Sequence, residues 1–207
     1  MNERGGIRLW HILVIIVFGS CIGALLLPPT DENIRKSPPQ KPATGSQPGT
    51  TAATPPAAQS VNLRAVDRAG FEAIIAEHRG KVVLVDFWAT WCLPCVEQLP
   101  HTLGLGQRLA DRGLAIVTVS CDDTGESTRV TQFLESQNAT SATNLISQFG
   151  GSSQTMEAFE ISTGAVPFYK LYDRTGELRE AFGINPAAKT QFTPADIEAA
   201  IERLLAE

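Results

Sequence analysis

One uninterrupted apolar strand limits what this chain can fold into. Residues 82–88, VVLVDFW, are apolar at both odd and even positions, apart from Asp86. A half-exposed strand alternates apolar and polar residues, whereas a central strand of a parallel sheet is buried on both faces and is apolar throughout. The segment therefore predicts an α/β protein whose sheet is covered by helices on both sides.

Strand and helix patterns alternate around this segment. Before it come a short strand over 61–66 and an amphipathic helix over 68–79, with Asp67 as its N-cap. After it we expect a helix kinked at Pro100 and a second buried strand over 114–120. A strand–helix–strand unit of this kind predicts a parallel pair with a right-handed crossover.

The rest of the domain has the patterns of a helix, a hairpin and a final helix. Residues 125–137 form a polar helical pattern, followed by a looser Ser- and Gly-rich segment to about residue 153. Strand patterns over 166–172 and 177–182 flank the turn sequence Asp-Arg-Thr-Gly and predict an antiparallel hairpin. A capped amphipathic helix over 193–207 ends the chain. The sum is a mixed sheet flanked by helices.

The N-terminal part has the pattern of a membrane anchor. Residues 9–27 are apolar and uncharged, and a helix of that length spans roughly 28 Å, close to the hydrocarbon thickness of a bilayer. Arg4 and Arg8 precede it, so the positive-inside rule predicts that residues 1–8 are cytoplasmic. We predict a single-pass signal anchor with the domain on the extracytoplasmic, periplasmic side.

Two other interpretations of this segment stay open. A cleaved signal peptide also has a charged start and an apolar core, but this run ends in Leu-Leu-Leu-Pro-Pro, without a small-x-small cleavage site. A lipoprotein would be acylated at Cys21, but apolar sequence continues for six residues past that cysteine. All three interpretations place the domain outside the cytoplasm.

Residues 28–60 have a composition that does not support a folded core. They hold eight of the 13 prolines and no aromatic residue. Such a segment buries too little apolar surface to offset the entropy of ordering. We therefore predict a disordered Pro-, Ala- and Thr-rich linker between the anchor and a domain formed by residues 61–207.

Two cysteines follow the apolar strand. Cys92 and Cys95 are separated by Leu-Pro at the predicted strand-to-helix junction, where their Cα atoms come within disulfide range. The unpaired N–H groups and positive dipole end of the helix favour a thiolate at Cys92. We expect Cys92 to attack the disulfide of a partner and Cys95 to resolve the mixed disulfide.

The same spacing also occurs in static disulfides and in halves of zinc sites. A zinc site would need two further ligands at matching spacing, and the available Cys121, His78 and His101 are unpaired in the sequence, so no metal is predicted. A haem attachment motif would need His directly after Cys95, where the chain has Val96.

Residues 85–95, VDFWATWCLPC, resemble the active-site segment of the thioredoxin superfamily. The ATWC-x-P-C form, Pro100 and the predicted anchor are most similar to the extracytoplasmic TlpA/ResA-like thiol-disulfide oxidoreductases of that superfamily. The resemblance covers residues 61–207 and is thin between 122 and 153. It implies a thioredoxin fold.

The resemblance also implies roles for single residues. Cys92 is the nucleophile, Cys95 the resolving thiol, and Trp91 and Pro94 support the disulfide. Asp86 is the buried acid behind Cys95. A desolvated carboxyl has a raised pKa, so Asp86 can take the proton from Cys95 as the mixed disulfide breaks. The alternative is a buried Asp that is only satisfied by hydrogen bonds.

Residues 164–168, GAVPF, match a second family site. The family has a cis-proline opposite the cysteines, and Pro167 fits that position. A cis bond directs the preceding backbone outward, so that Val166 would pair with an extended substrate peptide by strand addition. Pro167 and Trp91 are the other substrate-binding residues that we expect. A trans proline at the start of an edge strand is the alternative.

The chain departs from the TlpA-like pattern at three positions. TlpA-like sequences commonly have Glu three residues after the second cysteine, where this chain has Gln98, so no acid–base role is assigned there. Many of them carry Asn at the position of Asp86, which is more similar to thioredoxin itself. We interpret Cys121, at the end of the strand 114–120, as an inert buried thiol, with a role beside Cys92 as the alternative.

We therefore predict a membrane-tethered extracytoplasmic thiol-disulfide oxidoreductase, net reducing toward protein disulfides, in cytochrome c maturation or general redox homeostasis. Its Cys92–Cys95 disulfide would need no further cofactor. Its partners would be disulfide-containing proteins and a membrane-embedded thiol electron donor. With a net charge of −5, the chain does not have the basic character of a nucleic-acid binder. The alternatives are a disulfide oxidase or isomerase on the same fold, and a non-catalytic thioredoxin-like binding module.

Overall fold

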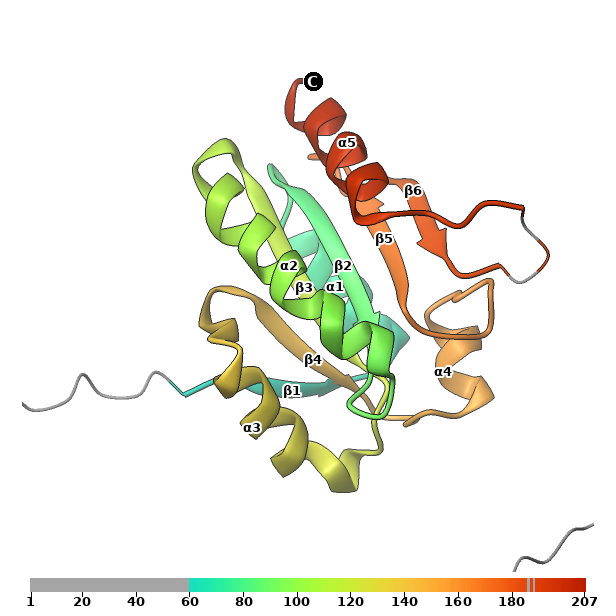
Figure 1. Cartoon of the computed structure of the whole chain (residues 1–207). Coiled ribbons are helices and arrows are strands. Elements are labelled where there is room, and N and C mark those ends of the chain that lie inside the picture. Colours follow the sequence, from blue (N-terminus) through green and yellow to red (C-terminus); the bar gives the residue numbers. More distant parts are fainter. Residues whose placement is uncertain (1–59, 186, 188) are drawn as a thin grey trace, which may run out of the picture. The chain divides into compact units, whose positions relative to one another are not determined.

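The computed structural model describes residues 60–185, 187 and 189–207 (Figure 1). The predicted cytoplasmic N-terminus, the anchor with Cys21, and nearly all of the predicted linker lie outside these residues. Within the described residues, no helix combines the length and the apolar character needed to cross a membrane.

A six-stranded mixed sheet forms the centre of the domain, in the order β1-β4-β3-β2-β5-β6. The four parallel strands are β1 (Leu63–Val66), β4 (Thr143–Ser147), β3 (Leu114–Ser120) and β2 (Val82–Trp88). The antiparallel strands are β5 (Phe168–Tyr172) and β6 (Leu178–Gly183), which form the predicted hairpin beside β2. Every residue of β2 is buried, as its apolar sequence predicts.

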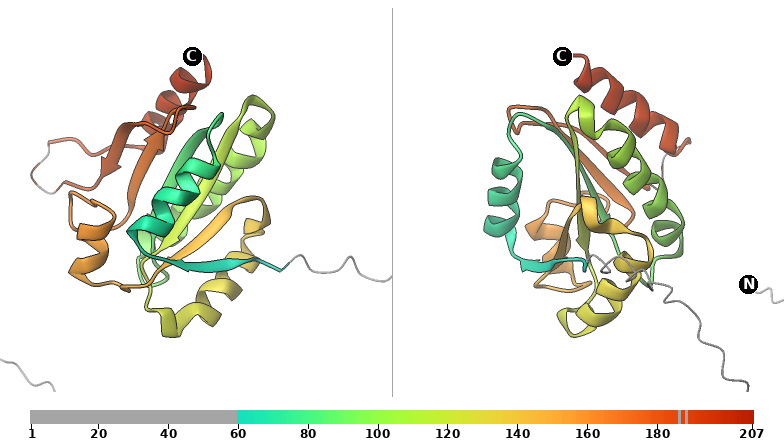
Figure 2. Two further views of the ribbon diagram at one scale, coloured as in Figure 1. Left: turned by 180° about the vertical axis from the view of Figure 1, so that it is seen from behind. Right: turned by 90° about the vertical axis from the view of Figure 1, so that its left-hand side faces the viewer.

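Helices cover both faces of this sheet (Figure 2). One face carries α1 (Arg68–Glu77) and α4 (Ser153–Ala158), and the other carries α2 (Leu93–Leu109), α3 (Ser127–Ser136) and α5 (Pro194–Leu205). Right-handed crossovers explain this division, because the chain crosses the sheet in one direction from β2 to β3 and β4, and in the other from β1 to β2.

Successive side chains of β2 point to opposite faces of the sheet and pack into a different apolar layer on each face. Phe87 packs with Phe71 of α1 and with Phe159, which follows α4. Its neighbours Asp86 and Trp88 point to the opposite face, where the Trp88 ring packs on Phe133 of α3. The predicted acid therefore faces the layer that contains α2.

The strand β4 corrects the expectation of a looser segment before residue 153. It has only five residues, and it begins with the polar Thr143 and Asn144, so its sequence pattern is that of a loop. The buried Asn144 amide accepts a hydrogen bond from the Thr118 hydroxyl (2.9 Å) and donates one to the Ala139 carbonyl (2.8 Å). Satisfied in this way, a polar side chain is tolerated in a central strand. The Ser- and Gly-rich sequence before it also does not predict the short helix α4.

The expected helices are otherwise present. α2 runs without interruption through Pro100, and the kink there stays a prediction. α3 lies within the polar pattern over 125–137. α5 begins with a capping box in which Thr193 and Asp196 bond each other's backbone N–H groups.

Candidate active site

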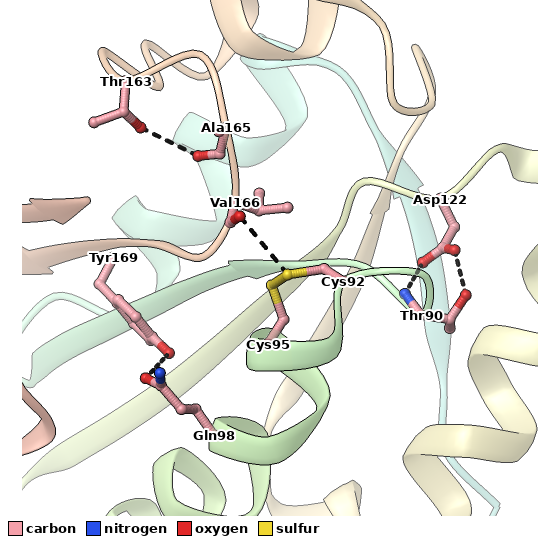
Figure 3. The surroundings of a disulfide bond; sticks show 9 residues. All are labelled: Thr90, Cys92, Cys95, Gln98, Asp122, Thr163, Ala165, Val166 and Tyr169. Atoms are coloured by element: carbon pink, nitrogen blue, oxygen red, sulfur yellow. Dashed lines mark hydrogen bonds between the residues drawn. A yellow bond between two sulfur atoms is a disulfide. The ribbon is translucent and has the colours of Figure 1, made fainter. Parts of the chain in front are cut away.

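The two cysteines of the CxxC segment form a disulfide at the start of α2 (Figure 3). Their sulfur atoms are 2.06 Å apart and their Cα atoms 5.3 Å apart. Cys92 is the N-cap of the helix, and Cys95 lies in its first turn, with Pro94 between them. Cys92 is 6% exposed and Cys95 is 1% exposed, so Cys92 is the cysteine nearer to solvent.

The helix start gives Cys92 a favourable setting for negative charge. The backbone of Cys92 is extended, its carbonyl accepts the Val96 N–H at 3.0 Å, and no side chain caps the first turn. The free N–H groups of that turn and the positive end of the helix dipole stabilise an anion at this position. The geometry therefore suits a thiolate at Cys92 once the disulfide is reduced.

The loop before β5 lies directly against the disulfide. The Val166–Pro167 peptide bond is cis, as predicted, and the Val166 carbonyl oxygen lies 3.7 Å from the Cys92 Sγ (Figure 3). The Thr163 hydroxyl donates to the Ala165 carbonyl within the same loop. The structure thus brings Val166 and Pro167 beside Cys92, although 74 positions separate Cys92 from Val166 in the sequence.

Two large apolar side chains beside Cys92 are open to solvent. Trp91 is 59% exposed and Leu93 is 67% exposed, whereas most large apolar residues of the domain are buried. Exposed apolar side chains grouped at one place mark a contact surface for another molecule. Trp91 and Leu93 flank Cys92 in the sequence, and the roles of Trp91 in supporting the disulfide and in binding substrate stay predictions.

Asp86 is buried in the core with an unusual environment. It is 1% exposed, and neither carboxyl oxygen has a hydrogen-bond partner among the described residues. Burial raises its pKa to about 7, and the nearby Thr102 hydroxyl offsets part of that rise without forming a hydrogen bond of ordinary geometry. The role of Asp86 as proton acceptor for Cys95 stays a prediction, as does the alternative of an Asp that is only satisfied by hydrogen bonds. Such a carboxyl exchanges protons near neutral pH.

The side chains of Asp86 and Cys95 both point into the space between the sheet and α2. Asp86 leaves β2 toward α2, and the buried side of α2 includes Cys95, Leu99 and Thr102. These three helix positions are spaced by four and three residues and therefore share one face. The structure accordingly places the carboxyl beneath α2, the helix that carries Cys95.

Tyr169, which the sequence did not single out, completes the buried site together with Gln98. Tyr169 of β5 is the ladder partner of Asp86, is 1% exposed, and donates its hydroxyl hydrogen to Gln98 Oε1 at 3.2 Å (Figure 3). Burial is the largest cause of its raised pKa, followed by the Asp86 charge. No local sequence signal points to Tyr169, because its pairing with Asp86 depends on the register between β5 and β2.

A second acid lies on the other side of the loop before Cys92. Asp122 follows β3, its side chain is 0% exposed, and it accepts hydrogen bonds from the Thr90 N–H (2.9 Å) and the Ser120 hydroxyl (2.8 Å). Arg129 of α3 reaches the same group at 3.4 Å. The sequence signal was a polar residue at the carboxyl end of a central parallel strand, which is where sites form in such sheets.

Cys121 has the properties of the inert thiol that the sequence predicts. It is a free, fully buried cysteine, and its backbone N–H donates to the Trp88 carbonyl at 2.7 Å. Burial, followed by the charges of Asp122 and Asp86, raises its pKa to about 12. The thiol therefore keeps its proton at physiological pH, and a protonated thiol is a poor nucleophile.

No metal site is formed by the part of the chain that the structure describes, since three or more His, Cys, Asp or Glu side chains do not gather there at any point. His78 is held by the Ile74 carbonyl through Nδ1 (2.8 Å), and His101 lies 3.4 Å from Glu198 of α5. Both histidines lie outside the group of residues around the disulfide.

Residues 57–197 match the model of the AhpC/TSA family. The chain belongs to this family. Together with the strand order and the helices on both faces, the match confirms the predicted thioredoxin-like fold.

Two curated proteins that are similar to parts of this chain are a thiol-disulfide oxidoreductase and the protein DipZ. The thiol-disulfide oxidoreductase ResA of Oceanobacillus iheyensis is 27% identical over 118 residues, covering 57% of this chain and 46% of that protein. The protein DipZ of Mycobacterium bovis is 51% identical over 41 residues, covering 20% of this chain and 6% of that protein. The chain thus spans less than half the length of these curated relatives.

A solved structure is also similar to this family member. The thiol:disulfide interchange protein, a thioredoxin family protein from Chlorobium tepidum, is 20% identical, with a TM-score of 0.46. The similarity covers 63% of this chain and 83% of that one.

Proposed function

We propose that this protein is a membrane-tethered, extracytoplasmic thiol-disulfide oxidoreductase that reduces protein disulfides. One observation supports the activity above all others. The Cys92–Cys95 disulfide lies at a helix start, between the exposed Trp91 and Leu93 and 3.7 Å from the Val166 carbonyl. A static disulfide needs neither an exposed apolar surface nor a buried proton acceptor beside it.

The first step forms a mixed disulfide. The Cys92 thiolate of the reduced protein attacks one sulfur of a substrate disulfide, and a bond forms between that sulfur and Cys92 Sγ. The substrate disulfide breaks, and its other cysteine leaves with the bonding electrons and takes up a proton. The positive helix end at Cys92 supports the thiolate that this step requires.

The second step releases the substrate. The Asp86 carboxylate takes the proton of Cys95, and the resulting thiolate attacks Cys92 Sγ. The Cys92–Cys95 bond forms, the mixed disulfide breaks, and the second substrate cysteine leaves as a thiolate that is protonated. Two electrons have then passed to the substrate. A carboxyl with a pKa of about 7 is suited to this transfer, because a general base works best near the ambient pH.

The substrate is held as an extended chain across the Val166 loop. Val166 precedes the cis-proline and is half-buried, and Ala165 beside it is exposed, so a substrate backbone can approach this loop for strand addition. The exposed Trp91 and Leu93, which flank Cys92 in the sequence, supply apolar contact to the substrate. Recognition that depends on main-chain groups accepts many sequences, in keeping with protein substrates.

Reduction outside the cytoplasm needs electrons from across the membrane. The proposal therefore includes a membrane-embedded thiol donor that reduces Cys92–Cys95 after each turnover, and the predicted anchor over 9–27 that keeps the domain near that donor. Cytochrome c maturation or general redox homeostasis is the proposed setting. Retention of the full chain in the membrane pellet after alkaline extraction tests the anchor.

Three variants of the full chain test the activity in insulin reduction. Cys92→Ser should abolish turnover, and Cys95→Ala should accumulate a mixed disulfide visible on a non-reducing gel, because the resolving thiol is missing. Cys121→Ser is the matched control and should retain activity, because Cys121 is buried and protonated. Activity that survives Cys92→Ser would refute the proposed function.

A redox titration against glutathione decides the direction of transfer. A potential of about −270 mV, like that of thioredoxin, supports a reductase. A potential of about −120 mV, like that of a strong oxidant, would instead assign a disulfide oxidase on the same fold.

A further inference from the structure

A buried carboxyl and a buried tyrosine leave the sheet side by side beneath α2. Asp86 of β2 and Tyr169 of β5 are directly paired in the antiparallel ladder, so both side chains lie on one face with closely spaced Cβ atoms. Both residues are 1% exposed, and the carboxyl oxygens have no hydrogen-bond partner among the described residues. In a dry environment, an unpartnered carboxyl responds strongly to the orientation of nearby dipoles.

Gln98 determines which way the Tyr169 hydroxyl is turned. It lies on α2, three positions after Cys95, and its Oε1 accepts the hydroxyl hydrogen at 3.2 Å (Figure 3). A hydroxyl has a single hydrogen, so a Tyr169 that donates to Gln98 offers only lone pairs in other directions. Those lone pairs favour a protonated neighbouring carboxyl over a charged one.

Among the other polar groups near Asp86, the Thr102 hydroxyl of α2 lies near both the carboxyl and Tyr169, and it offsets part of the rise in the pKa of each. Thr118, its ladder partner on β3, donates its hydroxyl hydrogen to Asn144 instead. The buried residues of α3 and α5 are all apolar. The titratable groups that face Asp86 from the elements packed against it are Cys95 on α2, Cys121 at the end of β3 and Tyr169 on β5.

We propose that Gln98 and Tyr169 are positioning residues for the acid–base step: by accepting the Tyr169 hydroxyl hydrogen, Gln98 keeps it from Asp86 and preserves the carboxylate as a strong proton acceptor for Cys95. The inference rests on the proposed function, in which Asp86 takes that proton. It also explains an uncharged residue at position 98. The amide supplies an acceptor for Tyr169 without adding a second negative charge beside Asp86.

The Gln98→Leu variant of the full chain tests the proposal. It removes the acceptor at similar size, so the Tyr169 hydroxyl is free to turn and donate to the Asp86 carboxylate. The Asp86 titration midpoint should fall by about one pH unit, because a hydrogen bond to the charged form favours that form. NMR of ¹³C-labelled aspartate in the oxidised protein measures this, with the Asp86 signal assigned by its loss in Asp86→Asn.

The functional readout is the rate at which the Cys92 mixed disulfide is resolved, measured against pH. In Gln98→Leu the acidic limb of this profile should move to lower pH by about one unit, the same shift as the Asp86 titration midpoint. The plateau rate should fall several-fold, because the base is weaker. A merely structural role of Gln98 lowers the rate without moving the limb.

A second background isolates the hydroxyl. Tyr169→Phe removes the oxygen and keeps the ring that packs on Phe192. In this background Gln98→Leu should leave both the titration midpoint and the limb unchanged. The matched control is Tyr172→Phe, on the same strand but on the opposite face, and it should leave the wild-type profile unaltered.

The outcomes separate the two proposals. An unchanged or raised midpoint in Gln98→Leu, or an equal shift in the Tyr169→Phe background, overturns the positioning role. Loss of insulin reduction by the wild type refutes the proposed function instead, and the NMR titration then still decides whether the pair controls Asp86.

Discussion

The Asp122 carboxylate holds both the backbone and the side chain of Thr90, two residues before Cys92. It accepts the Thr90 N–H at 2.9 Å and the Thr90 hydroxyl at 2.5 Å, and its own side chain has no exposed surface (Figure 3). The Ser120 hydroxyl donates to it as well, at 2.8 Å. The hydrogen bonds of one buried acid thus connect the end of β3 to the loop that precedes Cys92.

Asp122→Ala should lower the free energy of unfolding by about 2 to 4 kcal/mol, because it leaves the partly buried donors of Thr90 and the buried Ser120 hydroxyl without an acceptor. The control is Arg129→Ala. Arg129 also contacts Asp122, but its side chain is 55% exposed, so its loss should cost less than about 1 kcal/mol. Urea unfolding of the oxidised full chain measures both. Equal losses in the two variants would contradict a dominant role of the buried hydrogen bonds.

Local patterns were sufficient to predict much of the fold. The doubly buried β2, the hairpin after Pro167 and the capped final helix each depend on residues that are adjacent in the sequence, and all three are present. The disulfide at the start of α2 was predictable for the same reason, because the cysteine spacing and the strand-to-helix junction are both local.

Features that depend on distant contacts were not predictable. β4 contains Asn144, which resembles a loop residue until its partners Thr118 and Ala139 are known. Likewise, Gln98 and Tyr169 are 71 positions apart, and no periodicity relates them. The sequence resemblance located Asp86, but only the packed structure shows that its oxygens lack partners.

The Asp86 carboxyl should make stability depend on pH. Its pKa is about 7 in the folded protein against an ordinary value of 3.8, so between these values the folded state holds a proton that the unfolded state has lost. Stability from this group is therefore complete below pH 4 and is lost as pH rises to about 7. About three pH units at about 1.4 kcal/mol each set an upper limit of about 4 kcal/mol.

The Asp86→Asn variant isolates this contribution. The difference in unfolding free energy between wild type and variant should fall steadily from pH 4 to pH 7 and then become constant. Urea unfolding at several pH values, with both proteins oxidised, measures the difference. A difference that stays constant, or that grows with pH, would show that the carboxyl is not held in its neutral form by burial.

Two glycines of α2 should respond in opposite ways to alanine. A Cβ at Gly104 would meet only the flexible Arg108 side chain at 3.5 Å, so Gly104→Ala should stabilise by about 0.5 to 1 kcal/mol through helix propensity. A Cβ at Gly106 would lie 2.4 Å from Cγ1 of the buried Ile116 on β3. Overpacking there costs about 1 to 3 kcal/mol and exceeds the gain, so Gly106→Ala should destabilise.

The urea midpoints of the two glycine variants should therefore move in opposite directions from the wild type. Ile116→Ala provides the control, because shortening Ile116 removes the atom that obstructs residue 106. Its cost should be smaller in the Gly106→Ala background than in the wild type, since the two positions are in contact and their effects are not additive. Shifts in the same direction, or strictly additive costs, would mean that the close approach of α2 to β3 at Gly106 does not limit the residue there.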